Sequence, residues 1–576
     1  MTALAMPSAA VVGAAHARPL FLIGCVALVL AWQLPGHYPP WVAFQQEMVA
    51  AVGAALIGWA VVAQAQRLVW PRLALLALAV AGVPLAQRAF GLIAFNSTAI
   101  LATLYVLGFA LAMVAGATMA RTAAAREFVP PIVSTFAVGA CISALLAMMQ
   151  WQHVGVPNLW ITDLAPGMRP YANFAQPNHL ATLLACGVGA FVFAYESRRL
   201  GGVATSAGLT LLGIGLLATQ SRTSWLFVAV LVGGGLVLRR RAALRTSLAA
   251  LCVGGALFVL GVLAWAPLNE AMLLTSHSLS SRLQAGPRQV LWPLMLAASL
   301  RRPWFGYGWN QSGVAQFDAA LDFAPAHYYF QSAHNVVLDL LLWNGWPIGL
   351  LVAAAIGWWF WRRLQVCRSG AGWALLAAVL AAWLHALVEY PLSYAYFLLP
   401  IGLLMGIVEG SESSAPLPTA RRLSLALPLA VACVFGFWAA VEYVEVEASM
   451  RVQRFVLAGV GIDKVDSAPR PDVKLLDAEL ALLDLATAPV RAGMSEAELA
   501  AMARLVALNA FPRPLFRYAT ALALNGRTQE AAQVLDKLCR MNTLALCSGA
   551  AAEWRSLQAA DPTLAAVPAP SPLHGM

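Results

Sequence analysis

Four basic side chains lie in connections between apolar segments and could act together on an anionic ligand. Arg222 stands in TQSRTSWL between two short apolar runs, and Arg282 and Arg288 precede an amphipathic run that ends at Pro303. An arginine stays charged and donates paired hydrogen bonds to phosphate, and His334 can accept or hold a proton near neutral pH. The pattern predicts a cationic, proton-handling site. The alternative for Arg222 is simple loop placement, with the side chain snorkelling to water.

A second polar group stands where a helix is expected to begin. In YANFAQPNHL, Pro177 favours the first helical turn, with Gln176 before it and Asn178 and His179 after it. Capping of the helix by Asn or His is the structural alternative to a functional role. A helix N-terminus also offers free N–H groups to a phosphate. We therefore place these three polar residues in a substrate-binding site.

His334 and Asn335 open another predicted helix, in SAHNVVLDLLLWNGWPIGLL. We expect Asn335 to lie at the site beside His334, and the alternative for the pair is an interfacial helix cap. Asp339 follows one turn later along the same helix. It either orients the start of the helix or faces a cavity.

The segment HALVEYPLSYAYF ends one apolar run and begins the next. Glu389 and Tyr390 are its candidates for the site, whereas Tyr394 and Tyr396 fit an aromatic belt at the membrane surface better. The acidic residues of these connections have no spacing typical of metal ligands, so we expect a site with no metal ion and no cofactor. These acids are Asp163, Asp318, Asp322 and Glu389.

The composition excludes an ordinary soluble enzyme. Of 576 residues, 61% are hydrophobic and only 11% are charged, against about 25% charged in soluble domains. The net charge of +10 comes largely from short arginine clusters between apolar runs, which are typical of topology signals and not of a nucleic-acid-binding face. All three lysines lie in the last quarter of the chain. This shift predicts a boundary near residue 445, with membrane-embedded chain before it and a soluble domain after it.

Apolar runs close to the length that a spanning helix needs, about 20 residues, predict thirteen transmembrane helices. They lie at about 18–34, 46–64, 72–88, 97–119, 129–149, 178–195, 203–219, 224–238, 247–265, 335–360, 371–387, 393–409 and 423–443. Alternate connections carry the arginine clusters, which the positive-inside rule assigns to the cytoplasm. Arg18 places the N-terminus there too, so we interpret the first run as a transmembrane helix and not a cleavable signal. The remaining connections, which hold the candidate residues, then lie on the opposite side, and the odd number of helices places the C-terminal domain there too.

The chain after residue 445 is predicted to be helical. LFRYATALALNGRTQEAAQVLDKL pairs two amphipathic helices around Asn525-Gly526, which resembles a tetratricopeptide-type hairpin. A generic helical cap is the alternative. Cys539 and Cys547 could form a disulfide if this domain lies in an oxidising compartment. The other six cysteines fall in apolar runs, where we expect them to be packing residues.

Five motifs occur in order between about residues 130 and 410. They are AQPNHLATLL, SRTSWL, PWFGYGWN, AHNVVLDLLLWNGWPIGLL and HALVEYPLSYAYFL. The combination resembles the O-antigen ligase/polymerase superfamily of bacterial membrane glycosyltransferases. Within it, the chain is most similar to the PglL-type protein O-oligosaccharyltransferases. The features that favour this branch are HYPPWVAFQQEMVAA near 37–51, the HALVEYPLSYAYF segment and the long helical C-terminal domain.

The resemblance implies an all-α fold like that of the GT-C glycosyltransferases and an inverting, metal-independent reaction at the periplasmic face of the inner membrane. An oligosaccharide would pass en bloc from undecaprenyl pyrophosphate to a Ser or Thr hydroxyl of a periplasmic protein such as pilin. Arg222 and Arg288, with Arg282, would bind the pyrophosphate, while His334 would accept the hydroxyl proton or orient the acceptor. The implied substrate-binding residues are Gln176, Asn178, His179, Arg282, Asn335, Glu389 and Tyr390.

The expected organisation has four parts. An N-terminal transmembrane region (1–128) precedes a catalytic transmembrane region (129–410) with a periplasmic loop (266–334), and the last transmembrane helix (411–444) precedes a periplasmic helical domain (445–576). The nearest alternative function is an O-antigen ligase that uses lipid A–core as acceptor, followed by a polymerase that lengthens the glycan on its carrier. A transporter should line a path through the bilayer with polar residues, whereas here they gather on one face. A membrane scaffold would leave the clustered arginines and histidines unexplained.

Overall fold

The structure is a computed structural model that describes residues 9–154, 160–165, 167–174, 176–272, 274, 288–412, 416–457 and 470–571. The chain is mostly helical and divides into two compact units, each built from segments far apart in the sequence. Unit 1 comprises Met1–Ala81, Leu104–Gln284 and Ala355–Phe437. Unit 2 comprises Gly82–Thr103, Ala285–Ala354 and Trp438–Met576.

The apolar runs form helices, as predicted. Nine helices among the described residues are long and apolar enough to span a membrane, and four shorter apolar helices accompany them. Each of the thirteen runs identified in the sequence corresponds to one of these helices, with ends that agree to within two residues or extend into a longer helix. The chain is therefore a polytopic membrane protein, while the crossing of the bilayer by all thirteen stays a prediction.

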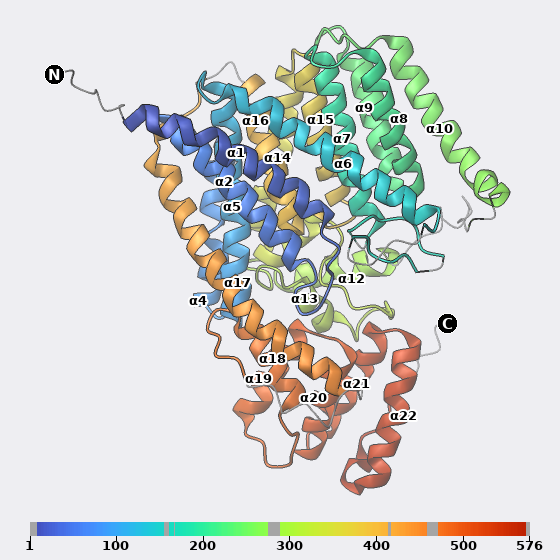
Figure 1. Ribbon diagram of the computed structural model, residues 1–576. Helices are drawn as coiled ribbons and strands as arrows, with labels where there is room; N and C mark the ends of the chain where they lie inside the picture. Colours follow the sequence, from blue (N-terminus) through green and yellow to red (C-terminus); the bar gives the residue numbers. More distant parts are fainter. Residues whose placement is uncertain are drawn as a thin grey trace. The chain divides into compact units, whose positions relative to one another are not determined.

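Unit 1 is a layer of packed helices around α7. Its helices are α1 (Ala9–Gln33), α2 (Phe44–Gln64), α3 (Arg72–Val80), α6 (Val129–Trp151), α7 (Pro177–Glu196), α8 (Gly202–Thr219), α9 (Arg222–Leu238), α10 (Leu248–Ala271), α15 (Gly370–Ala386), α16 (Ala395–Glu412), most of α5 (Asn96–Arg121), the end of α14 (Val336–Val366) and the start of α17 (Leu423–Leu457). In Figure 1, α7 lies among α6, α8 and α15, with which it also makes its main contacts. Small residues allow this close approach: a Cβ on Gly189 would come within 2.7 Å of Ala378.

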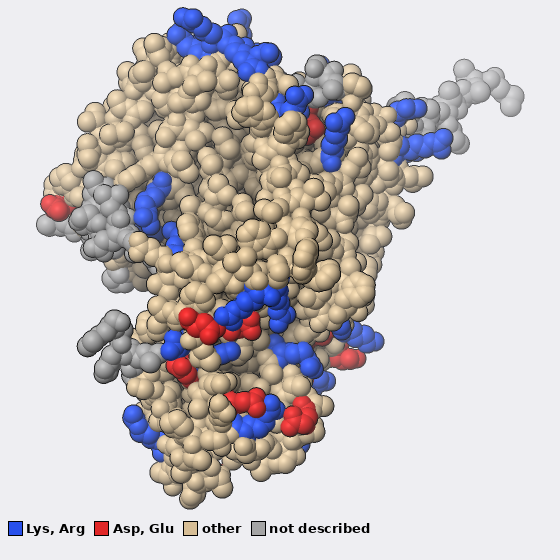
Figure 2. Space-filling model, turned by 180° about the vertical axis from the view of Figure 1, so that it is seen from behind, with Lys and Arg blue, Asp and Glu red and all other residues tan. Residues whose placement is uncertain are grey.

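Short connecting elements complete unit 1. The strands β1 (Arg67–Val69) and β2 (Thr419–Arg421) pair antiparallel, the 3-10 turn η1 (Arg126–Phe128) precedes α6, and η2 (Pro391–Ser393) precedes α16. The face of unit 1 seen in Figure 2 is largely uncharged, and Lys and Arg gather at the edge where α9 joins α10. That connection contains Arg239, Arg240, Arg241 and Arg245. The arrangement fits an apolar surface in lipid with an arginine-rich turn outside it.

Unit 2 combines the start of α14 with the C-terminal helices. Its elements are α4 (Val83–Ala89), α12 (Arg288–Arg301), α13 (Ser312–Ala319), the first part of α14 (Val336–Val366), the last part of α17 (Leu423–Leu457), α18 (Asp477–Thr487), α19 (Glu496–Leu508), α20 (Pro512–Leu524), α21 (Thr528–Met541), α22 (Leu544–Ala560) and η4 (Pro562–Ala566). The predicted amphipathic pair corresponds to α20 and α21, which pack together across a turn at Gly526. Both charge signs mix on the surface of these helices (Figure 2).

Two predicted helices are interrupted. The run at 72–88 divides into α3 and α4 because Pro84 lacks an N–H and its ring would clash with the carbonyl four residues back, at Val80. α14 kinks at Gly345, whose φ is +73°. The kink frees the carbonyls of Leu342 and Trp343, which accept hydrogen bonds from the N–H groups of Tyr307 (2.7 Å) and Gly308 (3.2 Å). The bend at Gly306-Tyr307-Gly308 is thereby fixed against the helix that begins just after His334.

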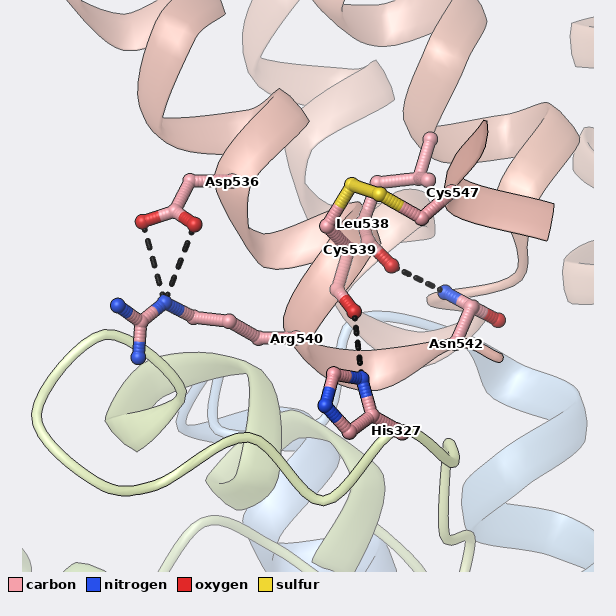
Figure 3. The surroundings of a disulfide bond; sticks show 7 residues. All are labelled: His327, Asp536, Leu538, Cys539, Arg540, Asn542 and Cys547. Carbon is pink, nitrogen blue, oxygen red and sulfur yellow. Dashed lines mark hydrogen bonds and ion pairs between the residues drawn. A yellow bond between two sulfur atoms is a disulfide. The ribbon is translucent and has the colours of Figure 1, made fainter. Parts of the chain in front are cut away.

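The C-terminal helices have their own core and a covalent link. Leu515, Leu522, Leu535 and Leu538 lie in one buried cluster with other residues of α19 to α22. Cys539 and Cys547 form a disulfide across the turn between α21 and α22 (Figure 3). The pairing that the sequence allowed is therefore present.

Candidate active site

The predicted site residues fall in both units. Unit 1 holds Gln176, Asn178, His179, Arg222, Glu389 and Tyr390, and unit 2 holds Arg288, His334 and Asn335. Arg282 lies outside the described residues. Each group is described within its own unit.

Asn178 joins three segments of unit 1. Its amide nitrogen donates to Glu389 Oε1 (2.9 Å), and its amide oxygen accepts from Ser221 Oγ (2.8 Å). Glu389 is only 5% exposed, so this neutral partner satisfies part of a buried carboxylate. The capping alternative for Asn178 is wrong, because its side chain bridges α7 to the α8–α9 turn and to the segment after α15.

Arg222 is presented by that same α8–α9 turn. Gln220 adopts a left-handed conformation (φ 49°), and Ser221 caps α9 by accepting from the N–H of Thr223 (3.3 Å). Arg222 is then the first residue of α9 and is exposed. Its guanidinium has no ion-pair or hydrogen-bond partner among the described residues. An exposed arginine at a helix N-terminus is well placed to meet an anion.

His179 lies in a buried aromatic cluster. It is 1% exposed, and its Nδ1 is 3.3 Å from the hydroxyl of Tyr396, which is also 1% exposed. The rings of Tyr394 and Tyr390 have their centroids 4.9 Å and 6.0 Å from that of His179. The aromatic-belt interpretation is therefore wrong for Tyr396. Its hydroxyl needs a partner once buried, and His179 in the first turn of α7 supplies it.

Gln176 stands at the entry to α7. Its backbone is extended (φ −146°, ψ 121°), Pro177 begins the helix, and the Gln176 side chain makes no capping hydrogen bond. Its carbonyl accepts from the N–H of His179 (3.1 Å). The half-buried Gln176 side chain is thus held at the end of the helix without being used as a cap.

The N-terminal signature supports this half of the site, a role that the sequence alone did not assign. The carboxylate of Glu47, 1% exposed, accepts from Trp41 Nε1 (2.6 Å), the Tyr105 hydroxyl and the N–H of Ala395 (3.3 Å). Ala395 is the first residue of α16 and is followed directly by Tyr396. Glu47 therefore fixes the segment that carries the tyrosines around His179.

In unit 2, a buried carboxylate holds the chain just before His334. Asp339, 3% exposed, accepts from Ser312 Oγ (2.5 Å), Ser332 Oγ (2.7 Å) and the N–H of Ala333 (2.8 Å). His334 has a left-handed backbone (φ 52°), and its N–H donates to Ser332 Oγ (3.0 Å). Such backbone costs free energy unless its surroundings impose it. Asp339 thus orients the start of the helix, one of the two roles considered for it.

Asn335 and Arg288 occupy helix ends. Asn335 Oδ1 accepts from the N–H groups of Val337 (3.0 Å) and Leu338 (3.1 Å), so Asn335 caps α14. This is the structural alternative considered for it. Arg288 is half-buried and is the first described residue of α12. Arg301 pairs with Asp322 (2.6 Å), which shows that arginines of this segment also have structural roles.

Arg169 was missed in the sequence. It lies in the connection between α6 and α7 and donates from Nη1 to the carbonyl oxygen of Gln220 (3.2 Å). Burial, together with the positive charge of Arg222, lowers the pKa of Arg169, while Glu389 opposes that shift. A lone arginine in a connection that the positive-inside rule predicts to be poor in arginine was the available signal.

Three sequence profiles match the chain. "Protein glycosylation ligase" matches residues 170–192, "O-Antigen ligase" matches 207–354, and "Virulence factor membrane-bound polymerase, C-terminal" matches 371–541. These stretches contain every described candidate residue of both units. The fold and these matches together define a polytopic membrane protein similar to protein glycosylation ligases, O-antigen ligases and a membrane-bound polymerase.

Two characterised relatives narrow the class. A general O-oligosaccharyltransferase of Acinetobacter baylyi is 33% identical over 548 residues, which cover 91% of this chain and 92% of the relative. A ComP-specific O-oligosaccharyltransferase of the same organism is 27% identical over 345 residues, 57% of this chain and 61% of the relative. The chain belongs to the general O-oligosaccharyltransferase family of membrane enzymes. The resemblance noted in the sequence is confirmed.

Proposed function

We propose that the chain transfers an oligosaccharide en bloc from undecaprenyl pyrophosphate to Ser or Thr hydroxyls of periplasmic proteins such as pilin. The observation that carries the proposal is the exposed guanidinium of Arg222 at the start of α9, beside the hydrogen-bonded pair of Asn178 and Glu389. A diphosphate is the anion that this donor class presents at the membrane surface. Membership of an O-oligosaccharyltransferase family supports a lipid-linked glycan as donor and a protein as acceptor.

The proposed reaction is a single displacement with inversion. The acceptor oxygen bonds to the first carbon of the leading sugar as the bond from that carbon to the pyrophosphate oxygen breaks. His334 accepts the hydroxyl proton or orients the acceptor. Arg222 and Arg288, with Arg282, stabilise the negative charge on the departing undecaprenyl pyrophosphate, so that no metal ion is needed.

The remaining candidates position substrates. Gln176 and Tyr390 contact sugar or phosphate in this proposal. Asn178 and Glu389 hold the turn that presents Arg222. His179 acts with the tyrosines that surround it, and Asn335 acts through the helix start that follows His334. Membrane lipids surround the apolar helices, and no nucleic acid is involved.

The proposed orientation places the site and the C-terminal helices in the periplasm. Two observations support it: arginine clusters alternate along the connections, and the disulfide between Cys539 and Cys547 requires an oxidising compartment to persist. We also propose that the thirteen apolar helices form a GT-C-like membrane domain and that α19 to α22 are tetratricopeptide-like. Labelling of single cysteines placed next to Arg222 and Arg240 from each side of the membrane tests the orientation. Labelling of both from the same side would contradict it.

A reconstituted transfer assay tests the function. The purified chain in nanodiscs receives undecaprenyl-pyrophosphate-linked oligosaccharide and a pilin-type acceptor, and mass spectrometry locates the glycan. We expect intact glycan on Ser or Thr and free undecaprenyl pyrophosphate. Addition of single sugars, or no modified protein at all, would contradict the proposal.

An O-antigen ligase activity is the second candidate, favoured by the profile match over residues 207–354. It would use the same donor and deliver the glycan to lipid A–core. The same assay with lipid A–core in place of protein separates the two. A polymerase would instead lengthen the glycan on the lipid carrier. The same assay, run with the donor and without any acceptor, detects this product.

A further inference from the structure

A pocket in unit 1 lies beside the turn that presents Arg222. It is lined by the end of α6, the connection before α7 and the α8–α9 turn, and its lining includes Trp151, His153, Met168, Arg169 and Gln220. Arg222 follows Gln220 by two residues. The pocket therefore lies against the same turn that presents the predicted phosphate ligand, although Arg222 is not among its lining residues.

One wall of this pocket is rigid and aromatic. Trp151 Nε1 donates to Asn269 Oδ1 (2.7 Å), and the Trp151 ring has its centroid 5.0 Å from that of Trp265. A tryptophan with its N–H satisfied and its ring stacked keeps one orientation. Such a surface suits the apolar face of a sugar ring.

Arg169 links the pocket to the α8–α9 turn. Its hydrogen bond to the Gln220 carbonyl (3.2 Å) fixes the left-handed residue from which Arg222 emerges. Arg169 and Arg222 lie close enough for their positive charges to repel each other. The acid that offsets this repulsion at Arg169 is Glu389. Glu389 is already hydrogen-bonded by Asn178. Two arginines against one such carboxylate leave a net positive charge, which favours a multiply charged anion.

Gln220 supplies an unsatisfied acceptor. The residue is only 7% exposed, and its side-chain oxygen Oε1 is buried with no hydrogen-bond partner among the described residues. A buried polar atom without a partner costs roughly 1–3 kcal/mol. Gln220 lines the pocket, so a rotation of its side chain that turns Oε1 toward a sugar hydroxyl would recover this cost.

We propose that the first sugar of the lipid-linked donor binds at the mouth of this pocket, with Arg169 as a ligand of the attached phosphate and Gln220 as acceptor for a sugar hydroxyl. The proposal rests on the proposed function, since it takes the donor to be a glycosyl pyrophosphate lipid. It goes beyond that function by assigning two residues and a place for the sugar next to the diphosphate. Arg169 is thereby a binding residue as well as a support for the turn.

Binding of sugar-free undecaprenyl pyrophosphate to the full chain in nanodiscs tests the phosphate ligand. We expect Arg169→Ala to weaken binding by at least about tenfold, as for a lost charge-assisted contact, and Arg169→Lys to restore part of it. Undecaprenyl monophosphate should bind the wild type and Arg169→Ala with affinities within about threefold, because the second phosphate is the group lost. Arg198→Ala, an arginine at the other end of α7, is the matched control and should bind as the wild type. Equal affinity of Arg169→Ala and wild type for the pyrophosphate would overturn the proposal.

Gln220→Asn tests the sugar contact. Asparagine tolerates the left-handed backbone but is one methylene shorter, so its oxygen cannot reach the same donor. We expect the KM for the glycosylated donor to rise about three- to tenfold, the size of one hydrogen bond, with unchanged affinity for sugar-free undecaprenyl pyrophosphate. An unchanged KM for the glycosylated donor, or equal losses with and without the sugar, would overturn the assignment.

The two proposals can fail separately. If the wild type binds undecaprenyl pyrophosphate in an Arg169-dependent way but glycosylates no protein, the proposed function falls and the subsite stands. If the wild type glycosylates protein while Arg169→Ala binds and reacts like it, the subsite falls and the proposed function stands. Thermal unfolding of each variant shows whether a loss comes from misfolding.

Discussion

The two units hold their candidate residues by different means. In unit 1, side chains bond to side chains: Asn178 joins Glu389 to Ser221, and Arg222 projects from the adjoining turn into solvent. In unit 2, a buried carboxylate holds backbone and hydroxyl groups: Asp339 binds Ser332 and Ala333 just before the left-handed His334.

This difference indicates different tasks. A proton-accepting group must be held in one geometry, because misplacement of about 1 Å can cost on the order of a hundredfold in rate. A guanidinium that receives a mobile lipid headgroup gains from a side chain free to adjust its position. The comparison predicts that substitutions in the Asp339-held segment of unit 2 reduce kcat, whereas substitutions at the Asn178 bridge of unit 1 chiefly raise the KM for the donor.

The largest effect is expected at His334. His334→Asn removes the ring but tolerates the positive φ, so the loss of a general base should lower kcat by about 10²- to 10⁴-fold with insertion into the membrane unchanged. Turnover of lipid-linked donor, with protein level in the membrane as reference, measures it. His327→Asn is the control, because His327 has a similar backbone (φ 49°) but contacts the carbonyl of Cys539 (Figure 3). Full activity in His334→Asn would remove this residue from the mechanism.

Asp339→Asn should have the next largest effect. The amide keeps the shape of the side chain but replaces one carboxylate oxygen by an NH2 group. That group cannot accept from the three donors that the carboxylate of Asp339 faces. Losing such contacts costs roughly 1–3 kcal/mol, so kcat should fall about 5- to 150-fold as His334 loses its fixed backbone. The KM for the donor should change less than about threefold, since charge-assisted phosphate contacts remain. A change confined to KM would contradict the contrast between the units.

Substitutions at Asn178 and Glu389 should have smaller effects than those at His334 and Asp339. Asn178→Ala removes the bridge between Glu389 and Ser221 and loosens the turn that presents Arg222. We expect the KM for the donor to rise, with kcat little affected. A double-mutant cycle with Glu389→Gln should give a coupling free energy of about 0.5–3 kcal/mol, as for residues in one hydrogen-bond network. Additive effects of the two changes would show that the bridge does not contribute.

Much of this architecture could be predicted from local sequence. Long apolar runs fix helices because a spanning chain must satisfy its own backbone hydrogen bonds, and the amphipathic repeat around Gly526 gave α20 and α21. The break at Pro84 was also available from the sequence. The kink at Gly345 was not, because it depends on carbonyls that bond to Tyr307 and Gly308 far along the chain.

The site was predictable as a set of residue types but not as a set of contacts. Arg222 was identified because charge is costly near lipid, and His334 because a histidine can accept a proton near neutral pH. The burial of Tyr396 against His179 could not be read from HALVEYPLSYAYF, since a belt tyrosine and a buried one have the same local pattern. Glu47 needed long-range contacts: it lies in the N-terminal signature, but its role depends on Ala395, some 350 residues away.

The disulfide should have the smallest effect on catalysis and a clear effect on stability. Replacing Cys539 and Cys547 by serine opens a loop of sequence separation 8, which should destabilise the C-terminal helices by roughly 2–3 kcal/mol on the chain-entropy model. The last turn of α21, next to the disulfide, also carries Arg540, which donates to the carbonyl of Phe323 (3.0 Å). Loosening it should therefore lower the thermal midpoint of these helices while kcat at low temperature stays within about threefold, because His334 keeps its Asp339-held backbone. Cys252→Ser, a free exposed cysteine, is the control for thiol loss. If the double serine variant unfolded like the wild type but lost transfer, the C-terminal helices would belong to the catalytic machinery. They would then not serve only to stabilise the unit that holds His334.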